Sequence, residues 1–597
     1  MDRNEAAEML DSLGKQRFAE LMKSIPADGA GRFALFLEIT RIVDYWSVHQ
    51  QLASPEKRLS VHDESLARWG WSLAAKHLLR PLELGGIPVA RSDNDSLTHA
   101  GEIVRHFGIV FLLHRCAAMI RAGFMVARRE QDLLVVDGAE YAATHFRDDY
   151  ELNRWLDLEE QLEAGNHPQS RLWQPFESSR WAEIKNRPGN WMNWHSENDG
   201  RLALSDPLSV MSPLVRPWSP GKGPVMMSYS SSEEIDNHFI AETADTVRKW
   251  CTEIGVGGRV PFGKIDGGIL AALTNLLASF CVKHVAFAQA AAKDHKSISI
   301  PHCLTIWTPI HKFQEDLTNF TGLDRATITE GLAAFTLRAS EAENLSETAT
   351  FNHPFLIDLG NGLCLRPVAA VTRNPLAVAA TMLAWRDRPA WDRVIATREE
   401  RMREEFYALF QGARYARVEG NVKIREGTRI LTDIDAAILD RTSGELLLVQ
   451  LKWQDIREND FRSYRSKAKN LSEELNRWAG DVLGWLQRTA PADVARALRF
   501  RQKEGEIRKI YLLGLSQIMA RPDGLGYGGF PEQLAVANWY HFLRTRFEIG
   551  PVENVFGEIH TRLKTDHATI PEFAPRPFSC TVGTQRIRIE RMWCAYR

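Results

Sequence analysis

The sequence lacks the cysteine pattern of a disulfide framework or of a paired-cysteine zinc site. It has 7 cysteines in 597 residues, an odd number, and no two are spaced as a CxxC pair. The cysteines are Cys116, Cys251, Cys281, Cys303, Cys364, Cys580 and Cys594. This usage favours a reducing, cytoplasmic location over an oxidising compartment.

The chain also lacks an excess of charge of either sign. Lys and Arg number 74 and Asp and Glu number 76, so the formal net charge is -2. A near-neutral protein has no general attraction for polyanions. Any contact with nucleic acid would therefore depend on a local basic patch.

No apolar run is long enough to span a bilayer without interruption. The segment 106–127 is broken by His114, Arg115 and Arg121, and the segment 267–282 is too short. The first residues, MDRNEAAEMLDSLGKQRF, are polar where a signal peptide needs an apolar run. We therefore expect neither a leader peptide nor a membrane partner.

Helical periodicity prevails before residue 390, and an alternating pattern follows. A chain of 597 residues is long enough for several domain-sized units. Asn361-Gly362 between two apolar runs predicts a β-hairpin, and a Pro-, Trp- and Gly-rich segment without any period predicts a boundary. The expected units are a helical N-terminal domain (1–166), an irregular boundary region (167–225), a second helical region ending in a hairpin at about 354–366 (226–389), an α/β domain (390–545) and a C-terminal extension with a short strand (546–597).

The expected α/β domain alternates helices and strands. A helix should end near residue 411, and a strand, a hairpin at 430–453, a long helix and a strand at 509–515 should follow. This order predicts a mixed sheet with helices packed against it. The long helix shows an apolar stripe with alternating spacings of 4 and 3: Tyr464, Ala468, Leu471, Leu475, Trp478, Val482 and Trp485.

Polar residues gather at one end of the hairpin TDIDAAILDRTSGELLLVQLKW. If Asp440 pairs with Glu445 across the turn, Asp435 lies opposite Gln450 and Asp433 lies opposite Lys452. One face would then be wholly apolar, with Ile434, Ala436, Ile438, Leu447, Val449 and Leu451. The other would carry Asp433, Asp435, Ala437, Leu439, Leu446, Leu448, Gln450 and Lys452.

Two interpretations account for charges at the end of a buried strand. An Asp–Lys ion pair alone would satisfy them. A hard cation such as Mg²⁺ or Mn²⁺ would explain more, because Asp435, the Gln450 side-chain oxygen and the Leu451 carbonyl are oxygen ligands. Lys452 could then orient or help deprotonate a water and offset charge that develops on a phosphate.

The hairpin resembles the PD-(D/E)xK, or restriction endonuclease-like, nuclease superfamily. ILTDIDAAIL is similar to the family's aspartate strand, and LLLVQLKW is similar to its second catalytic strand. The resemblance implies that Asp435 binds metal, that Gln450 holds the Glu/Gln position and that Lys452 is the catalytic lysine. A QxK site resembles the branch of Mrr-type restriction enzymes and Holliday-junction resolvases.

The resemblance leaves two positions open. Thr432-Asp433 replaces the Pro-Asp of the family's name, so either Asp433 or Asp435 could be the principal ligand. The family often adds a glutamate from the preceding helix, and Glu405 shares a helical face with Met402, Phe406 and Leu409. A solvated glutamate is the alternative.

A local basic patch follows the lysine. Its residues are Arg457, Arg462, Arg465, Lys467 and Lys469. Such a patch beside the hairpin predicts phosphate binding, although a solvated helix start would look the same.

The expected function is a Mg²⁺- or Mn²⁺-dependent nuclease that prefers DNA, with the helical part as a sensor, specificity or oligomerisation unit. By analogy of architecture, it would be a prokaryotic defence or restriction effector, and a homo-oligomer is among the expected states. A silent nucleic-acid-binding protein with the same fold is one alternative. A nucleotide-switched ATPase or GTPase is another, because GRVPFGK at 258–264 contains GxxxxGK, with Gly263 and Lys264 as its key residues.

Overall fold

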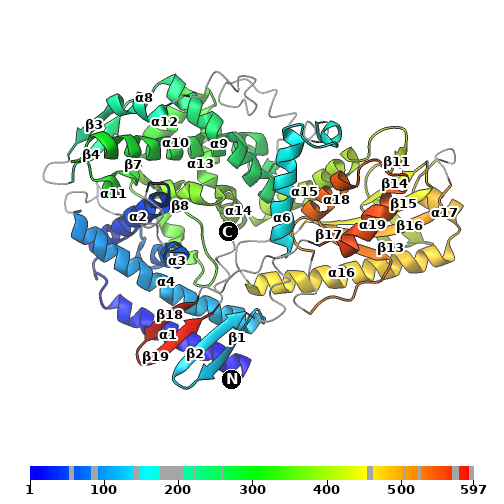
Figure 1. Ribbon diagram of the computed structural model, residues 1–597, viewed down its shortest axis with the longest axis horizontal. Coiled ribbons are helices and arrows are strands. Elements are labelled where there is room, and N and C mark those ends of the chain that lie inside the picture. Colours follow the sequence, from blue (N-terminus) through cyan, green and yellow to red (C-terminus); the bar gives the residue numbers. More distant parts are fainter. Residues whose placement is uncertain are drawn as a thin grey trace.

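In a computed structural model, the chain forms helical regions and one α/β domain (Figure 1). This agrees with the fold class predicted from the sequence at the level of a helical part plus an α/β part. The structure describes residues 1–52, 60–82, 92–138, 147–174, 176, 204, 206–219, 224–256, 260–453, 461–501, 506–520, 526–567 and 577–590.

Four long helices form the N-terminal region: α1 (Arg3–Met22), α2 (Gly29–Leu52), α3 (Val61–Leu78) and α4 (Asn94–Ala122). Asp2 and Glu5 form a capping box at the start of α1, and Asp93 caps α4. The apolar side of α2 is buried against its neighbours, as Phe36 and Ile39 show.

A four-stranded sheet joins segments from both ends of the chain. β1 (Met125–Glu130) and β2 (Leu133–Gly138) form one hairpin, and β18 (Phe578–Val582) and β19 (Gln585–Ile589) form the other. β19 pairs in parallel with β2, so the two hairpins lie side by side in Figure 1. The C-terminal extension thus completes a sheet that begins at residue 125.

The second helical region surrounds a separate apolar core. Its longer helices are α9 (Glu233–Ile254), α10 (Gly267–Asp294), α12 (Ile310–Thr321), α13 (Arg325–Ala334) and α14 (Pro375–Arg386), and its shorter ones are α8 (Pro207–Met211) and α11 (Ile300–Cys303). Its strands are β3 (Val215–Trp218), β4 (Met226–Tyr229), β5 (Pro261–Phe262), β6 (Ile265–Asp266), β7 (Ile306–Pro309), β8 (Thr336–Arg338), β9 (Leu356–Asp358) and β10 (Leu363–Arg366). β9 and β10 form the hairpin expected around Asn361-Gly362.

Helices α4 and α10 are long and apolar enough to cross a membrane by length and composition. However, 72% of the most apolar window of α4 and 78% of that of α10 are buried inside the protein. Burial of this extent is what core helices show.

The α/β domain contains a five-stranded sheet in the order β11-β14-β15-β16-β17. β11 (Tyr415–Arg417), β14 (Ala436–Asp440) and β15 (Glu445–Lys452) are antiparallel, whereas β16 (Lys509–Ser516) and β17 (Leu534–Asn538) run parallel to β15. β12 (Val422–Glu426) and β13 (Arg429–Ile434) form a separate two-stranded ribbon. The helices are α15 (Arg388–Ala408), α16 (Phe461–Arg488), α17 (Pro491–Ala497), α18 (Trp539–Ile549) and α19 (Val555–Thr565).

Helix α16 covers one face of this sheet along its predicted apolar stripe. Leu471, Leu475 and Val482 are buried with sheet residues such as Leu446 and Leu448. The start of α16 also touches the N-terminal region, because the rings of Tyr464 and Phe124 meet edge to face with centroids 6.2 Å apart.

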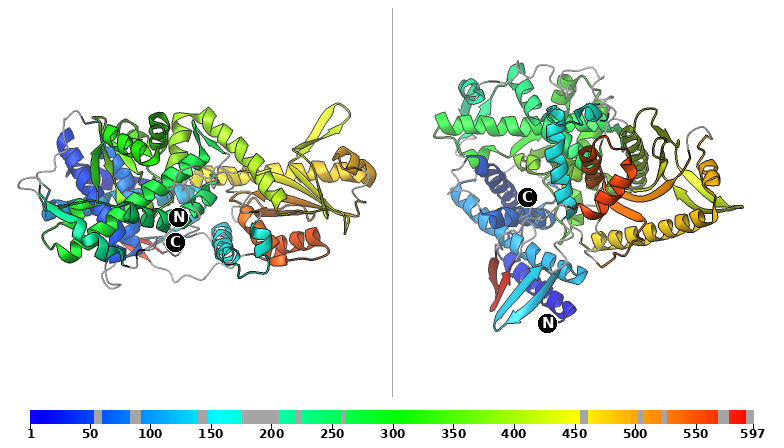
Figure 2. Two further views of the ribbon diagram at one scale, coloured as in Figure 1. Left: turned by 90° about the horizontal axis from the view of Figure 1, so that it is seen from above. Right: turned by 45° about the vertical axis from the view of Figure 1, so that its right-hand side comes forward.

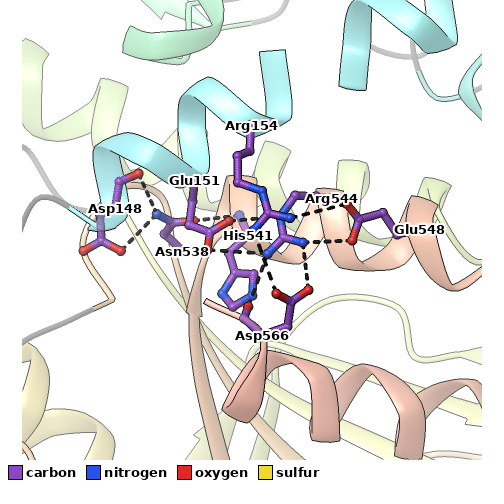
Figure 3. Close-up of polar contacts among 8 residues, drawn as sticks. All are labelled: Asp148, Glu151, Arg154, Asn538, His541, Arg544, Glu548 and Asp566. Carbon is purple, nitrogen blue, oxygen red and sulfur yellow. Dashed lines mark hydrogen bonds and ion pairs between the residues drawn. The ribbon is translucent and has the colours of Figure 1, made fainter. Parts of the chain in front are cut away.

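The opposite face of the sheet is covered by α15, α18, α19 and α6 (Arg147–Glu163). The sequence placed α6 in the helical N-terminal domain, but it packs against α18 of the α/β domain (Figure 1). Arg544 of α18 lies between Glu151 of α6 and Asp566, with N···O distances of 3.0 Å to each carboxylate (Figure 3). A buried polar network therefore fastens α6 to the α/β domain.

The register predicted for the β14–β15 hairpin is confirmed from Asp440 back to Ala436. Asp440 pairs with Glu445, and Ala436 pairs with Val449. The ladder ends there, because the chain turns out of the sheet at Asp435 and pairs with β12 instead. This corrects two expectations: Asp433 lies opposite Lys423 rather than Lys452, and Ile434 joins the core under α16 rather than the opposite face.

Candidate active site

Asp435 occupies the point where strand β13 leaves the sheet. Its backbone N–H still donates to Val449, at 3.1 Å. Its carboxylate Oδ2 accepts a hydrogen bond of 2.8 Å from the backbone N–H of Leu451. The kink therefore turns this carboxylate toward the end of β15, where the sequence predicted a metal ligand.

Burial raises the pKa of the Asp435 carboxyl to about 6. The hydrogen bond from Leu451 and the charge of Lys452 oppose this increase, whereas the nearby carboxylates of Asp433 and Glu399 add to it. A cation at this position would favour the ionised form of Asp435.

Asn421 joins the two candidate aspartates. Its side-chain Nδ2 donates to Asp433 Oδ2 at 2.9 Å and to Asp435 Oδ1 at 3.1 Å. Both carboxylates therefore point toward the Asn421 amide nitrogen, whose partly positive hydrogens lie between them. The backbone carbonyl of Asp433 accepts from Trp478 Nε1 of α16 at 2.8 Å, which fixes the kinked strand against that helix.

Gln450 has a buried side-chain oxygen that no described residue satisfies. Its side chain is on β15, the residue is only 5% exposed, and Oε1 has no hydrogen-bond partner in the described part of the chain. Most buried polar atoms do have such a partner. An unpaired amide oxygen at this place fits an oxygen ligand for a hard cation.

Lys452 closes the site on the side of α16. Its Nζ lies 3.1 Å from Glu474 Oε2. Burial acts to lower the pKa of Lys452, but the nearby carboxylates of Glu474, Asp435 and Glu399 together keep it above its usual value. Lys452 is therefore protonated at neutral pH, which suits charge stabilisation better than removal of a proton.

The helix before the sheet offers Glu399 rather than Glu405. Glu405 does point inward as expected, but its Oε1 accepts from Arg401 Nε at 2.8 Å, so its charge is balanced within α15. Glu399 Oε1 accepts instead from the backbone N–H of Trp453, at 3.1 Å, beside Lys452. Glu399 therefore lies at the end of β15, whereas the expected Glu405 is paired with Arg401 of its own helix.

The residues present fit a hard divalent cation held by few protein ligands. No group of three or more His, Cys, Asp or Glu side chains suited to a metal occurs among the described residues. Asp435, Asp433 and the Gln450 oxygen nevertheless offer two carboxylates and one amide. Mg²⁺ commonly binds through one or two carboxylates and keeps several waters, so this set is sufficient.

The predicted basic patch is only partly brought together. Arg457 and the side chain of Arg462 lie outside the described residues. Arg465 donates to Tyr527 at 3.0 Å and to the carbonyl of Ala122 at 2.6 Å, so it fastens α16 to the end of α4. Lys469 lies 3.7 Å from Glu473 at the exposed surface of α16, and Lys467 lines a cavity beside α14.

A second basic feature was not expected from the sequence. The ribbon β12–β13 projects away from the sheet (Figure 2) and carries exposed Lys423, Arg425 and Arg429. Ile430 beside them is 46% exposed. The inner end of the same ribbon carries Asp433, so this basic arm begins at the candidate site.

The proposed phosphate loop around Lys264 does not have the required surroundings. Residues 261–266 form the small hairpin β5–β6, and the preceding element is helix α9 rather than a strand. Lys264 is 76% exposed in its side chain and lies 3.0 Å from Glu330. A phosphate-binding loop needs a strand before it and a helix that begins directly after its lysine.

Sequence reasoning missed Asn421, Glu399 and Glu474. Asn421 precedes a strand in an ordinary turn-like stretch, and Glu474 resembles any polar residue on the outer face of an amphipathic helix. No family model matches the chain, and neither a curated protein nor a solved structure matches it.

Proposed function

We propose that the α/β domain is a metal-dependent phosphodiesterase of the restriction endonuclease-like type that acts on nucleic acid. One observation supports this most: Asp435, whose buried carboxyl has a raised pKa, lies at the end of β15 that also carries Lys452 and the unpaired side-chain oxygen of Gln450. An ion pair between aspartate and lysine alone explains less, because Lys452 pairs with Glu474 and the Gln450 oxygen stays unsatisfied.

Asp435, Gln450, Asn421 and Lys452 would have different roles in the proposed reaction. A Mg²⁺ or Mn²⁺ ion bound here would polarise a phosphate oxygen and lower the pKa of a bound water. Asp435 and Gln450 would hold it, and Asn421 would release or share the carboxylates that it now bridges. Lys452, which stays protonated, would donate to a phosphate oxygen and stabilise the charge that develops there.

The substrate would approach from the side of the basic ribbon. Lys423, Arg425 and Arg429 lie along β12–β13, which leads directly to Asp433. Two-stranded ribbons fit the major groove of duplex DNA, so duplex DNA is the preferred substrate class. The helical regions would then serve as a sensor, specificity or oligomerisation unit.

The test is a cleavage assay with and without Lys452→Ala. Wild-type protein would be incubated with supercoiled and linear duplex DNA, single-stranded DNA and RNA, in Mg²⁺ and in Mn²⁺. We expect cleavage of at least one substrate, loss of that cleavage in Lys452→Ala, and retained binding in a gel-shift assay. Lys312→Ala is the control, because it removes an exposed lysine of α12 that pairs only with neighbouring acids.

A silent nucleic-acid-binding protein is the second candidate. It is favoured by glutamine at position 450, because one negative charge fewer weakens a metal site. Absence of cleavage by the wild type in both metals, with duplex binding that is lost when Arg425 and Arg429 are replaced by alanine, would support this candidate over the enzyme.

A further inference from the structure

A cavity of about 510 Å³ lies between the second helical region and the start of α16. Its walls come from residues 344–346 and 348–352, from α14 and Arg388, and from Ser463 and Lys467 of α16. Small-molecule sites usually have volumes of about 300–1,000 Å³ and are found between structural units. The cavity is separate from the candidate active site in its residues.

One wall of the cavity is aromatic. Trp385 near the end of α14 stacks on Phe351, with ring centroids 5.9 Å apart and an angle of 18° between the rings. Phe351 is buried, but Trp385 remains 38% exposed. A large indole left partly uncovered in a cavity wall provides a platform for another flat ring.

The remaining walls combine apolar side chains, such as Leu345 and Val378, with polar and basic ones. Lys467 and Arg388 line the cavity, together with hydroxyl and amide side chains, and no acidic residue is among the described lining residues. The nearby Glu347 carboxylate lies 3.9 Å from His77 Nε2 instead. Within the described part of the chain, Arg388 forms an ion pair with exposed Asp392, and an exposed pair of this kind is easily exchanged for another anion.

The loop that forms one wall is held in place from outside. Lys76 Nζ donates to the carbonyls of Glu343 and Leu345, each at 2.7 Å. The backbone N–H of Phe351 donates to Ser72 Oγ at 3.2 Å. The loop is therefore already ordered before a ligand binds, which lowers the entropic cost of binding. In this loop, the buried hydroxyl of Thr350 has no hydrogen-bond partner among the described residues.

We propose that this cavity binds a nucleotide, with its base stacked on Trp385 and its phosphate contacted by Lys467 and Arg388. A flat ring, a negative charge and several hydrogen-bonding groups are what these walls complement together. The nucleotide could be free or could be the end of a nucleic-acid chain, since both offer the same groups. This proposal does not depend on cleavage by the α/β domain.

The position of the cavity relates it to the candidate active site. Lys467 and Glu474 lie on the same face of α16, seven residues or about 10.5 Å apart along the helix. Glu474 holds Lys452 through the ion pair described above. A nucleotide at Lys467 would thus lie two helical turns from the partner of the proposed catalytic lysine.

Calorimetric titration of the full-length protein tests the proposal. The probes are AMP, ATP, GTP and a 5′-phosphorylated tetranucleotide of DNA. We expect at least one of them to bind with a dissociation constant below the millimolar range. Trp385→Ala and Lys467→Ala should each weaken it at least tenfold, whereas Trp385→Phe and Lys467→Arg should retain most of the affinity. Tighter binding of a mononucleotide identifies a free ligand, and tighter binding of the tetranucleotide identifies a chain end.

Three variants serve as controls. Arg477→Ala removes an exposed arginine of α16 away from the cavity, and Lys264→Ala tests the GxxxxGK segment. Lys452→Ala tests the candidate active site. All three should bind the nucleotide as the wild type does. Absence of binding by every probe at millimolar concentration, or binding that Trp385→Ala and Lys467→Ala leave unchanged, would overturn the proposal, as would binding lost only in Lys264→Ala.

Discussion

Trp453, the residue after the proposed catalytic lysine, packs directly on Gly255 at the end of helix α9. A Cβ atom built on Gly255 would lie only 2.0 Å from the indole Cη2 of Trp453. On its other side, the indole lies under the guanidinium of Arg398, at 5.1 Å. The strand that carries Gln450 and Lys452 is therefore fixed at its end by the second helical region.

This contact predicts that Gly255→Ala is unusually destabilising. Gly255 has a φ of +69°, and Gly322 at the end of α12 has a φ of +70° with no atom near its missing Cβ. In both alanine variants, the left-handed backbone should lower the free energy of unfolding by about 1 kcal/mol. Only Gly255→Ala must also displace Trp453, so its free energy of unfolding, measured in urea, should fall clearly more than that of Gly322→Ala. The same variant should also cleave more slowly. Equal losses in the two variants would contradict the contact.

The raised pKa of Asp435 predicts a pH-dependent metal affinity. Metal binding requires the ionised carboxylate, and the pKa of this group is raised from 3.8 to about 6. Below that value the proton competes, so Mn²⁺ affinity should fall by up to about tenfold per pH unit. Titration calorimetry between about pH 5 and about pH 8 should show a rise that levels off above the pKa. Asp435→Asn should bind weakly and without this dependence.

The same shift has a defined effect on stability without metal. Because the folded pKa exceeds the unfolded value, the folded state binds the proton more tightly. The free energy of unfolding should therefore decrease as the pH rises from about 4 to about 6, and Asp435→Asn should remove this decrease. An increase over this window that depends on Asp435 would contradict the buried position of the carboxyl.

Gln450→Glu adds a negative charge at the position that corresponds to the Glu/Gln of the resembled family. With Mn²⁺, the added carboxylate should increase affinity about tenfold or more, because ligand charge governs the affinity of hard cations. Without metal, the buried charge should lower the melting temperature. Gln450→Leu is the matched variant, since it removes the oxygen without adding charge and should bind Mn²⁺ more weakly than the wild type. Unchanged affinity in both variants would exclude residue 450 as a ligand.

The roles of Glu399 and Glu405 can be distinguished by measuring Mn²⁺ affinity as a function of pH. Glu399 raises the pKa of Asp435 through its charge, so Glu399→Gln should move the midpoint of the pH dependence downward while keeping an acceptor for Trp453. Glu405→Gln should leave the midpoint unchanged, because its carboxylate is paired with Arg401. A shift caused by Glu405→Gln alone would restore the original expectation.

Local patterns predicted the hairpin register and the apolar stripe of α16, because both follow from the backbone periods of two and 3.6 residues. The kink at Asp435 has no such signature: TDID reads as a continuous strand, and only pairing with β12 shows that it leaves the sheet. The sequence also does not separate the two glutamates of α15, for a related reason. Glu399 and Glu405 both lie near the inner side of α15, and the sequence does not say which turn reaches the end of β15.

The packing of α6 against the α/β domain could not be predicted either. In the sequence, Asp148, Glu151 and Arg154 have the pattern of a solvent-exposed helix face. In the structure, the carboxylate of Glu151 is 4% exposed and lies 3.0 Å from Arg544 (Figure 3). The burial of Glu151 depends on Arg544, a partner almost 400 residues away, and no local sequence pattern indicates it.

The buried network provides the sharpest stability prediction. Arg544 is only 1% exposed in its side chain and lies between Glu151, Glu548 and Asp566. Removal of one member of a buried ion pair leaves an uncompensated charge, so Arg544→Met should lower the free energy of unfolding by about 3–5 kcal/mol. Arg154 is 39% exposed and lies 3.9 Å from Glu548 and 3.8 Å from Asp566, so Arg154→Met should cost less than about 1 kcal/mol.

A double-mutant cycle shows whether the loss comes from the stranded charge. Adding Glu151→Gln to Arg544→Met removes the carboxylate that has lost its main partner, so the double variant should be more stable than Arg544→Met alone. Urea unfolding followed by circular dichroism measures all four proteins. If the two losses simply add, Glu151 is not coupled to Arg544, and the hydrogen bonds of Asp148 and the apolar contacts of Trp155 hold α6 to the α/β domain.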